Sequence, residues 1–226
     1  GRVFPINIHA GAYSPTTYPN LITTDGEIIL NGFNVAGFPS GNINRNSESA
    51  IYRDVWQTQT AEQLSQLAEV NIDGNVVINP DTRVAEITVE LEYTSSSAYN
   101  TNYLTIMMLQ DNIIGSQSGS SYNPEQIVDG QYRHMHVLRD VITPTWGDAV
   151  SPATAGTLIT KQYIYNIPEI IGDPNGVEVD LDNIYFLAFV AETYQGTPTR
   201  PILNVNKLEQ IESVDEPVYA FIKDAV

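Results

Sequence analysis

The sequence predicts an α+β protein in which a mixed segment of helices and strands, residues 1–69, precedes an all-β domain, residues 70–226. The strongest signal is the stretch 83–93, where Ala, Ile, Val, Leu and Tyr alternate with Glu and Thr. A period of two is typical of a strand with one face in a core and the other in water. The helical signal lies earlier, where Thr24 and Glu27 have the spacing of a capping box.

Composition narrows the classes of function. The chain has 226 residues, with 27 acidic against 10 basic side chains and a formal charge of −17 at pH 7. This charge repels nucleic-acid backbones and anionic lipid surfaces, so no nucleic-acid partner is expected. Cysteine is absent, which removes disulfides, thiolate nucleophiles and cysteine-ligated metals from the chain. No apolar run approaches the roughly 18 to 20 residues of a membrane-spanning helix.

Four elements and one turn are predicted in the first segment. Residues 3–9 alternate as a half-buried strand, and residues 24–31 form a short helix, with a strand as the alternative. After the Phe38–Pro39 turn, a polar strand is expected over 42–45 and a second helix over about 48–68. This is the order of elements in the second half of a thioredoxin-like domain, in which a structural cis-proline precedes a strand. The Phe38–Pro39 peptide is therefore predicted to be cis.

A succession of short strands separated by Gly, Pro, Asn and Ser is predicted for the rest of the chain. The candidates span residues 69–78, 83–93, 103–109, 112–115, 134–142, 160–167, 184–192, 201–208 and 218–222. Their number and spacing are typical of a sandwich of two antiparallel sheets, and the pattern leaves immunoglobulin-like and jelly-roll topologies open. The period of two places these side chains in the core: Ile87, Val89, Leu91, Leu104, Ile106, Leu109, Ile164, Phe186, Ala188 and Val190.

The stretch 132–148 concentrates the residue types that carry chemistry. It holds two of the three histidines and one of the two tryptophans. His134 and His136 are two residues apart and would project from one face of a strand, a spacing found in metal sites. A metal needs a third ligand, for which three residues are available without any spacing that favours one: Asp111, Asp140 and His9. Hydrogen-bonded strand histidines are the simpler interpretation.

Four more residues complete the binding candidates: Asp111, Asn112, Arg139 and Trp146. For Asp111 and Asn112 the simpler alternative is a turn stabilised by bonds from side chain to backbone. For Arg139 it is an ion pair with Asp140 or a backbone clamp beneath Trp146, which is itself expected to fill the core.

A cluster of acids around one turn supplies candidate calcium ligands, namely Asp173, Asn175, Glu178 and Asp180. The segment lacks the ligand order of an EF-hand, and a solvated hairpin turn is the favoured alternative. No Gly-x-Ser-x-Gly, Walker, His-Glu-x-x-His or dinucleotide fingerprint is present. The sequence therefore predicts no catalytic residue and no cofactor.

Several linked motifs resemble those of a known family. They are Leu109 to Gln117, His136 to Asp140, Thr143 to Asp148, Ile8 to Gly11 and Gly37 to Arg45. Together they resemble the Omp-twenty-eight-related outer-membrane proteins of Bacteroidetes over most of the chain. The resemblance implies surface lipoproteins with an amino-terminal thioredoxin-like region and a carboxy-terminal immunoglobulin-like sandwich, for which adhesion or receptor-like roles have been suggested.

The expected function is a non-enzymatic module of the cell surface or outer membrane that serves binding, adhesion or structure, with a protein or a glycan as ligand. Tyrosine-rich loops are expected to present the binding surface: Tyr93, Tyr99, Tyr103, Tyr122 and Tyr132. The alternative is an envelope thiol oxidoreductase whose cysteines lie upstream of Gly1. Association with the outer membrane, or with the periplasmic side of the envelope, is expected to use a lipid anchor that also lies upstream.

Overall fold

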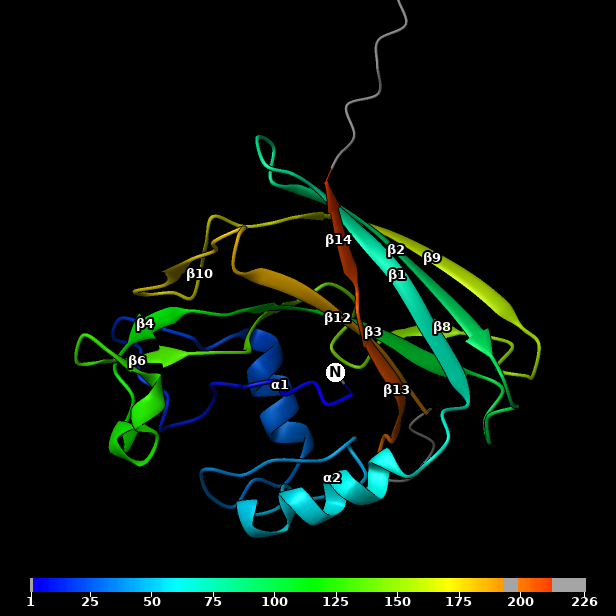
Figure 1. The fold of residues 1–226 in the computed structure, drawn as a ribbon, viewed down its shortest axis with the longest axis horizontal. Coiled ribbons are helices and arrows are strands. Elements are labelled where there is room, and N and C mark those ends of the chain that lie inside the picture. The colour runs from blue at the N-terminus through cyan, green and yellow to red at the C-terminus, as the bar shows by residue number, and fades with distance from the viewer. Residues whose placement is uncertain (1, 193–198, 213–226) are drawn as a thin grey trace, which may run out of the picture.

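The computed structural model describes residues 2–192 and 199–212, which are mostly β-sheet with two short α-helices (Figure 1). The strand predicted at 218–222 lies outside the described residues. The helical elements are α1 (Thr24–Gly32), η1 (Arg53–Val55), α2 (Trp56–Leu64), η2 (Ser120–Tyr122) and η3 (Pro124–Gln126). The strands are β1 (Val70–Asn79), β2 (Val84–Tyr93), β3 (Asn102–Gln110), β4 (Ile113–Gly115), β5 (Ile127–Val128), β6 (Gln131–His134), β7 (Val137–Val141), β8 (Asp148–Val150), β9 (Leu158–Asn166), β10 (Ile170–Ile171), β11 (Val177–Glu178), β12 (Ile184–Ala191), β13 (Ile202–Lys207) and β14 (Glu209–Glu212).

Two facing sheets form the body of the molecule. The first has the order β14-β1-β2-β9, and the second has the order β13-β12-β3-β7, with β8 also paired to β3. Neighbours in both sheets are antiparallel except β14, which runs parallel to β1. The sheets enclose one apolar core, to which the first contributes residues such as Val76 and Ile87 and the second Leu104 and Phe186.

The second sheet is covered on both faces. One face meets the first sheet, while the other is covered by α1 and the extended N-terminal segment (Figure 1). On that side Ile29 of α1 and Phe33, which follows the helix, pack against Leu109 and Leu187. Every residue of β12 is therefore buried, whereas in β2 the alternate residues from Glu86 to Glu92 face out of the core. Burial on one face or on two thus decides whether a strand alternates or reads as a continuous apolar run.

β13 and β14 form one run of chain that changes sheets at Leu208. β14 pairs with the second half of β1. Beside the first half of β1, the side-chain amides of Asn204 and Asn206 donate to the carbonyls of Val70 and Ile72 at 2.8 and 2.9 Å. This side-chain ladder ties the two sheets together along one edge.

The helix predicted at 24–31 is confirmed, with its cap one residue earlier than expected. Thr23 rather than Thr24 is the N-cap, and its hydroxyl accepts the backbone N–H of Gly26 at 3.0 Å. The helix predicted at 48–68 is shorter and consists of η1 and α2, because the chain is still extended at Ile51, where it pairs with Gly41.

Two predicted N-terminal strands are wrong. Residues 3–9 are extended but form only isolated bridges, from Asn7 and His9. Residues 42–45 form a turn because Asn44 and Arg45 have left-handed φ angles of 50° and 54°. The Phe38–Pro39 peptide is cis, as predicted.

Nine of the ten predicted core side chains are buried, and Ile164 is the exception at 77% exposure. The side chains of β9 that were expected to face the core face outward, and the reverse. Tyr163 and Tyr165 pack against the core, and Ile164 faces out. Leu109 is buried in the second apolar cluster, beneath α1, rather than between the two sheets. Tyr93, expected in a binding loop, is buried and donates from its hydroxyl to Asn102 Oδ1 at 3.0 Å.

Candidate functional site

The strand predicted over 134–142 is interrupted between its two histidines. β6 ends at His134, β7 begins at Val137, and His136 between them has a left-handed φ of 57°. The expectation of two imidazoles on one strand face is therefore wrong. His134 is buried, whereas His136 is partly exposed and belongs to a different set of contacts.

His136 contacts Asp111 and Tyr185. Asp111 Oδ1 accepts the backbone N–H of His136 at 2.6 Å and lies 3.3 Å from its Nδ1, and the Tyr185 hydroxyl is 2.7 Å from the same Nδ1. Burial, followed by the charge of Asp111, raises the pKa of Tyr185 well above its usual value, so the phenol stays neutral. Asp111 thus holds the β6–β7 turn through a backbone contact 25 residues away in the sequence, whereas the sequence pattern suggested a local turn.

Asn112 belongs to a chain of polar side chains that joins two turns. It has a left-handed φ of 61°, and its amide donates to Asn183 Oδ1 at 2.5 Å. The Asn183 amide in turn donates to Asp180 Oδ2 at 2.6 Å. The contacts of Asn112 and Asp180 therefore hold the loop ahead of β4 against the loop ahead of β12.

The calcium candidates around residues 173–180 lie in and beside the β10–β11 hairpin. The Asn175 amide donates to the Thr16 carbonyl at 2.9 Å, so this residue holds the N-terminal loop. Asp173 and Glu178 are exposed, and Glu178 borders a cavity of about 250 Å³ together with Arg83. Within residues 2–192 and 199–212, no three His, Asp or Glu side chains come together in a way that could hold a metal ion.

His134 packs against a histidine from the far end of the chain. The ring centroids of His9 and His134 are 5.3 Å apart, and the Tyr132 ring lies edge-on to His134 with 5.0 Å between centroids. Burial lowers the pKa of His9 to about 4, with further contributions from His134 and Arg139. Burial also lowers the pKa of His134. Both imidazoles are therefore neutral at pH 7 and join the N-terminal segment to β6.

Arg139 is the largest fully buried side chain, with 1% of its surface exposed. Its Nη2 donates to the carbonyls of Ile171 and Val177 at 3.2 and 2.9 Å, so it clamps the β10–β11 hairpin. The predicted alternative of an ion pair with Asp140 is not found among the described residues, because Asp140 Oδ2 accepts from the Tyr165 hydroxyl instead. Burial lowers the pKa of Arg139 to about 10, which leaves it charged.

Trp146 lies at the other end of β7, away from the histidine contacts. Its ring packs on Phe33 at the end of α1, and the guanidiniums of Arg45 and Arg200 lie 5.2 and 3.9 Å from its centroid. Arg45 is itself buried and also lies 4.7 Å from the Phe189 ring. Trp146 thus joins α1 and the Arg45 turn to the second sheet, and cation–π contacts strengthen this junction.

Each of the six binding candidates thus has a structural role in its own set of contacts. The six do not come together at one open site. One feature left open is the outer face of the first sheet, which sequence reasoning missed because Ile164 was assigned to the core. The face carries Glu86, Glu90, Glu92 and Asp73, and none of its described outward-facing residues is Lys or Arg. Asp73 and Glu90 are direct cross-strand partners. Leu158 and Ile164 on β9 border these acids with 75% and 77% of their surface exposed.

Among solved structures, HBP35 of Porphyromonas gingivalis is similar, with a TM-score of 0.63 at 17% identity. The match covers 84% of this chain and 59% of HBP35, so the chain spans little more than half of that relative. A domain of the outer membrane lipoprotein Omp28 from P. gingivalis matches with a TM-score of 0.41 at 16% identity, over 65% of this chain and 92% of that one. The sporulation control protein Spo0M of Bacillus subtilis matches with a TM-score of 0.36 at 9% identity, over 64% and 50% of the two chains.

No curated protein sequence matches the chain. The described helices are all too short to cross a membrane. A family model described as Outer membrane protein Omp28 matches residues 28–213, which include most of both sheets, α2 and the 132–148 stretch. The family resemblance of the sequence motifs is thereby confirmed: the chain belongs to the Omp28 family of outer membrane proteins.

Proposed function

We propose that this Omp28-family chain is a non-enzymatic binding module of the outer-membrane surface and that it docks a basic protein segment on the outer face of the β14-β1-β2-β9 sheet. The single observation that supports the proposal is the combination of uncompensated acids and exposed apolar side chains on that face. Like charges directly opposite each other destabilise a sheet. The Asp73–Glu90 pair therefore suits a partner that brings positive charge.

The arrangement of the face favours a protein over other partners. The register aligns Ile211, Val77, Glu86 and Ile164 in one row across four strands, so an acid lies between apolar neighbours. Protein interfaces combine apolar contact with a polar rim, and complementary charges steer a partner and fix its orientation. The same acids repel anionic lipid and nucleic acid.

The domain organisation is part of this proposal. Residues 70–226 would form an immunoglobulin-like sandwich, supported by the two facing sheets and their common core. Residues 1–69 would be the second half of a thioredoxin-like domain, supported by the order α1, Pro39 turn, Gly41–Ile51 bridge and α2. Attachment to the outer membrane would use a lipid anchor upstream, which mass spectrometry of the natural protein can identify. The descriptions of the family and of the similar structures mention no enzymatic activity.

The test uses a synthetic peptide in which Lys alternates with Val, titrated into the purified chain by calorimetry. The double variant Glu86→Lys, Glu90→Lys should bind at least about tenfold more weakly, and high salt should weaken binding to the unmodified chain. The matched control is Glu48→Lys, Glu125→Lys, which makes the same charge change at exposed positions on other elements. Equal loss in both double variants would show that net charge alone governs binding and would remove the face from the proposal.

A second comparison isolates the apolar part of the surface. Leu158→Ser should weaken peptide binding, whereas Leu67→Ser, at an even more exposed leucine outside the sheet, should leave it unchanged. If both substitutions leave peptide binding unchanged, the exposed Leu158 side chain of β9 takes no part in docking.

The second candidate function is an envelope thiol oxidoreductase whose cysteines lie upstream of Gly1. It is favoured by the same α1, Pro39 turn and α2 order, because a redox motif in a thioredoxin-like domain lies ahead of these elements. The chain itself contains no cysteine and so cannot exchange thiols. Insulin reduction by the full-length protein, lost when its upstream cysteines are replaced by serine, would establish this function in place of the first.

A further inference from the structure

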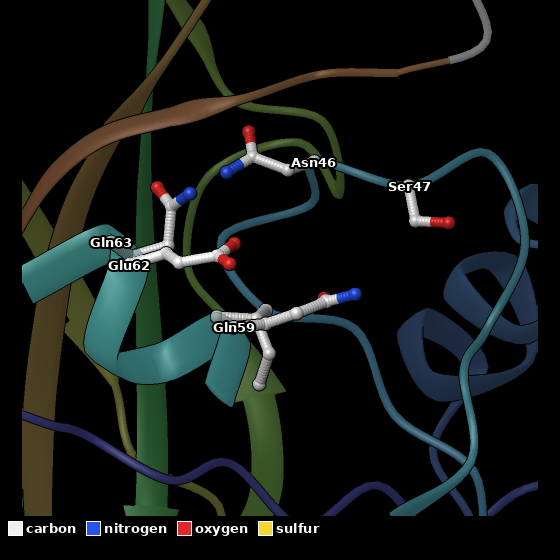
Figure 2. A pocket seen from close by; sticks show the side chains of 6 residues that line it. Asn46, Ser47, Gln59, Glu62 and Gln63 are labelled. Carbon is white, nitrogen blue, oxygen red and sulfur yellow. The ribbon is translucent and has the colours of Figure 1, made fainter. Parts of the chain in front are cut away.

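A polar cleft of about 310 Å³ lies between α2 and the turn that precedes η1. Six residues line it: Ile43, Asn46, Ser47, Gln59, Glu62 and Gln63. In Figure 2 the side chains of Asn46 and Gln63 point toward each other, and those of Glu62 and Gln59 extend from α2 into the space below Asn46 and Ser47. Two elements that are separate in the sequence thus present their polar side chains to one volume.

The walls of this cleft are held in place by contacts of Asn44 and Arg45, which do not line it. Asn44 donates to Gln63 Oε1 at 3.4 Å and accepts the backbone N–H of Ile202 at 2.8 Å. Arg45, next along the chain, is buried between Trp146 and Phe189. The turn is therefore anchored on both α2 and the second sheet. A ligand would meet a preformed site, so its binding would lose little free energy to ordering of the loop.

The base of the turn is closed by a second set of contacts. Gly41 and Ile51 exchange both backbone hydrogen bonds, at 2.7 and 3.0 Å. Trp56 packs so closely on Gly41 that a Cβ there would lie 2.8 Å from the indole, and its Nε1 donates to the Ile51 carbonyl at 3.2 Å. This arrangement sets where α2 begins and holds its first turn against the base of the loop.

The lining is rich in hydrogen-bonding groups and poor in charge. Gln59 and Asn46 each offer an amide with two donors and one acceptor oxygen, and neither side chain bonds to any described residue of the protein. The Gln63 oxygen is occupied by Asn44, which leaves its amide N–H groups to face the cleft. Glu62 adds an acceptor carboxylate, and Ile43 is the single apolar lining residue.

This chemistry selects a class of ligand. The Glu62 carboxylate and the net charge of −17 disfavour anions, and one carboxylate alone is a poor cation site because hard cations take six or more oxygens. Apolar ligands need walls that are mainly hydrophobic. What remains is a neutral molecule with many hydroxyl groups, and the volume is at the lower end of the range of about 300 to 1,000 Å³ for ligand pockets.

We propose that the cleft between α2 and residues 43–47 binds one or two rings of a neutral saccharide, with the amides of Asn46, Gln59 and Gln63 and the Glu62 carboxylate as partners of its hydroxyls. This site goes beyond the proposed protein docking on the outer sheet face and uses none of the same residues. A surface protein with both sites would hold a glycan and a protein partner on different elements.

The test is a glycan array of neutral and acidic saccharides probed with the labelled chain, followed by NMR titration of the strongest ligand. The expected result is a neutral saccharide whose titration saturates and shifts the backbone amides of residues 43–47 and 59–63. Asn46→Ala combined with Gln59→Ala should weaken binding at least tenfold. Gln57→Ala is the matched control, since Gln57 is exposed on the same helix and does not line the cleft.

Three results would overturn the proposal: no neutral saccharide that saturates, a preference for acidic saccharides, or equal weakening by Gln57→Ala and the double variant. Circular dichroism of each variant establishes that the fold is retained, which is expected because the substituted side chains make no described contact with the core. The Glu86→Lys, Glu90→Lys variant should bind the saccharide like the unmodified chain. Failure of peptide docking and failure of saccharide binding are therefore separate outcomes.

Discussion

The imidazole of His9 lies edge-on to that of His134, with 5.3 Å between the ring centroids. The pKa of His9 is lowered from 6.5 to about 4, chiefly by burial and then by His134 and Arg139. Between those two pKa values the unfolded chain binds more protons than the folded chain, so stability rises with pH through this window. Stability is therefore lost as the pH falls from 6.5 toward 4, by at most about 3 kcal/mol for this one group.

We predict that His9→Gln flattens this part of the stability curve. Urea unfolding at pH 7, 6, 5 and 4 should show a smaller loss of unfolding free energy on acidification than in the unmodified chain. Ile8→Gln is the control, because it alters the neighbouring exposed residue without removing a titratable group. An unchanged slope in His9→Gln would mean that His9 titrates at an ordinary pKa.

A second prediction concerns the contact between α1 and Trp146. A Cβ on Gly32 would lie 2.6 Å from two atoms of the Trp146 ring, so Gly32→Ala should force the indole off Phe33 and destabilise the chain by about 1–3 kcal/mol. Gly37→Ala is the control, since the nearest atom to its Cβ would be 3.9 Å away. Equal melting temperatures for the two variants would show that the indole moves without cost.

The third prediction concerns Arg139 and the hairpin that it clamps. Arg139→Met removes two charge-assisted bonds to the Ile171 and Val177 carbonyls but also removes the burden of a buried cation, so the net loss should be about 1–3 kcal/mol. Hydrogen exchange should accelerate mainly in residues 170–178. Arg53→Met, at an exposed position, should leave that exchange unchanged. Protection that persists in Arg139→Met would assign the hairpin to other contacts.

Much of the fold could be predicted because its signals are local. β2 alternates along nine residues, and one phase of that pattern leaves Glu side chains in water while the other would bury them. In β9 the pattern is ambiguous, because the aromatic rings of Tyr163 and Tyr165 can fill a core as the Ile164 side chain can. Pairing with β2 decides which side chains of β9 face the core. Tyr163 is the partner of the buried Ile87, and Ile164 is the partner of the exposed Glu86.

The candidate site was harder to predict because its contacts are long-range. His134 and His136 are adjacent in the sequence pattern, yet His134 meets His9 and His136 meets Tyr185. A single left-handed residue at His136 separates them, and left-handed histidines are uncommon enough that the pattern gives no warning. The polar cleft was missed for a similar reason, because the turn at Asn44 and Arg45 reads as a polar strand.

The last prediction concerns the bond from the Tyr165 hydroxyl to Asp140 Oδ2, which is 2.5 Å long. Burial raises the pKa of Asp140, while this bond and the backbone N–H of Val141 hold it down. Tyr165→Phe removes one of the two donors from a partly buried carboxylate, so it should destabilise the chain at pH 7 by about 1–3 kcal/mol. It should also raise the pKa of Asp140 further.

The sign of the pH dependence follows from that shift. A carboxyl whose folded pKa is raised above its unfolded value destabilises the fold above the folded pKa, and this penalty disappears as the pH falls through it. The difference between Tyr165→Phe and the unmodified chain should therefore shrink as the pH is lowered from 7 to 4 in urea unfolding experiments. In an Asp140→Asn background the group no longer titrates, so the effect of Tyr165→Phe should become independent of pH. A difference that stays constant with pH when Asp140 is present would show that the phenol acts through packing rather than through the carboxylate.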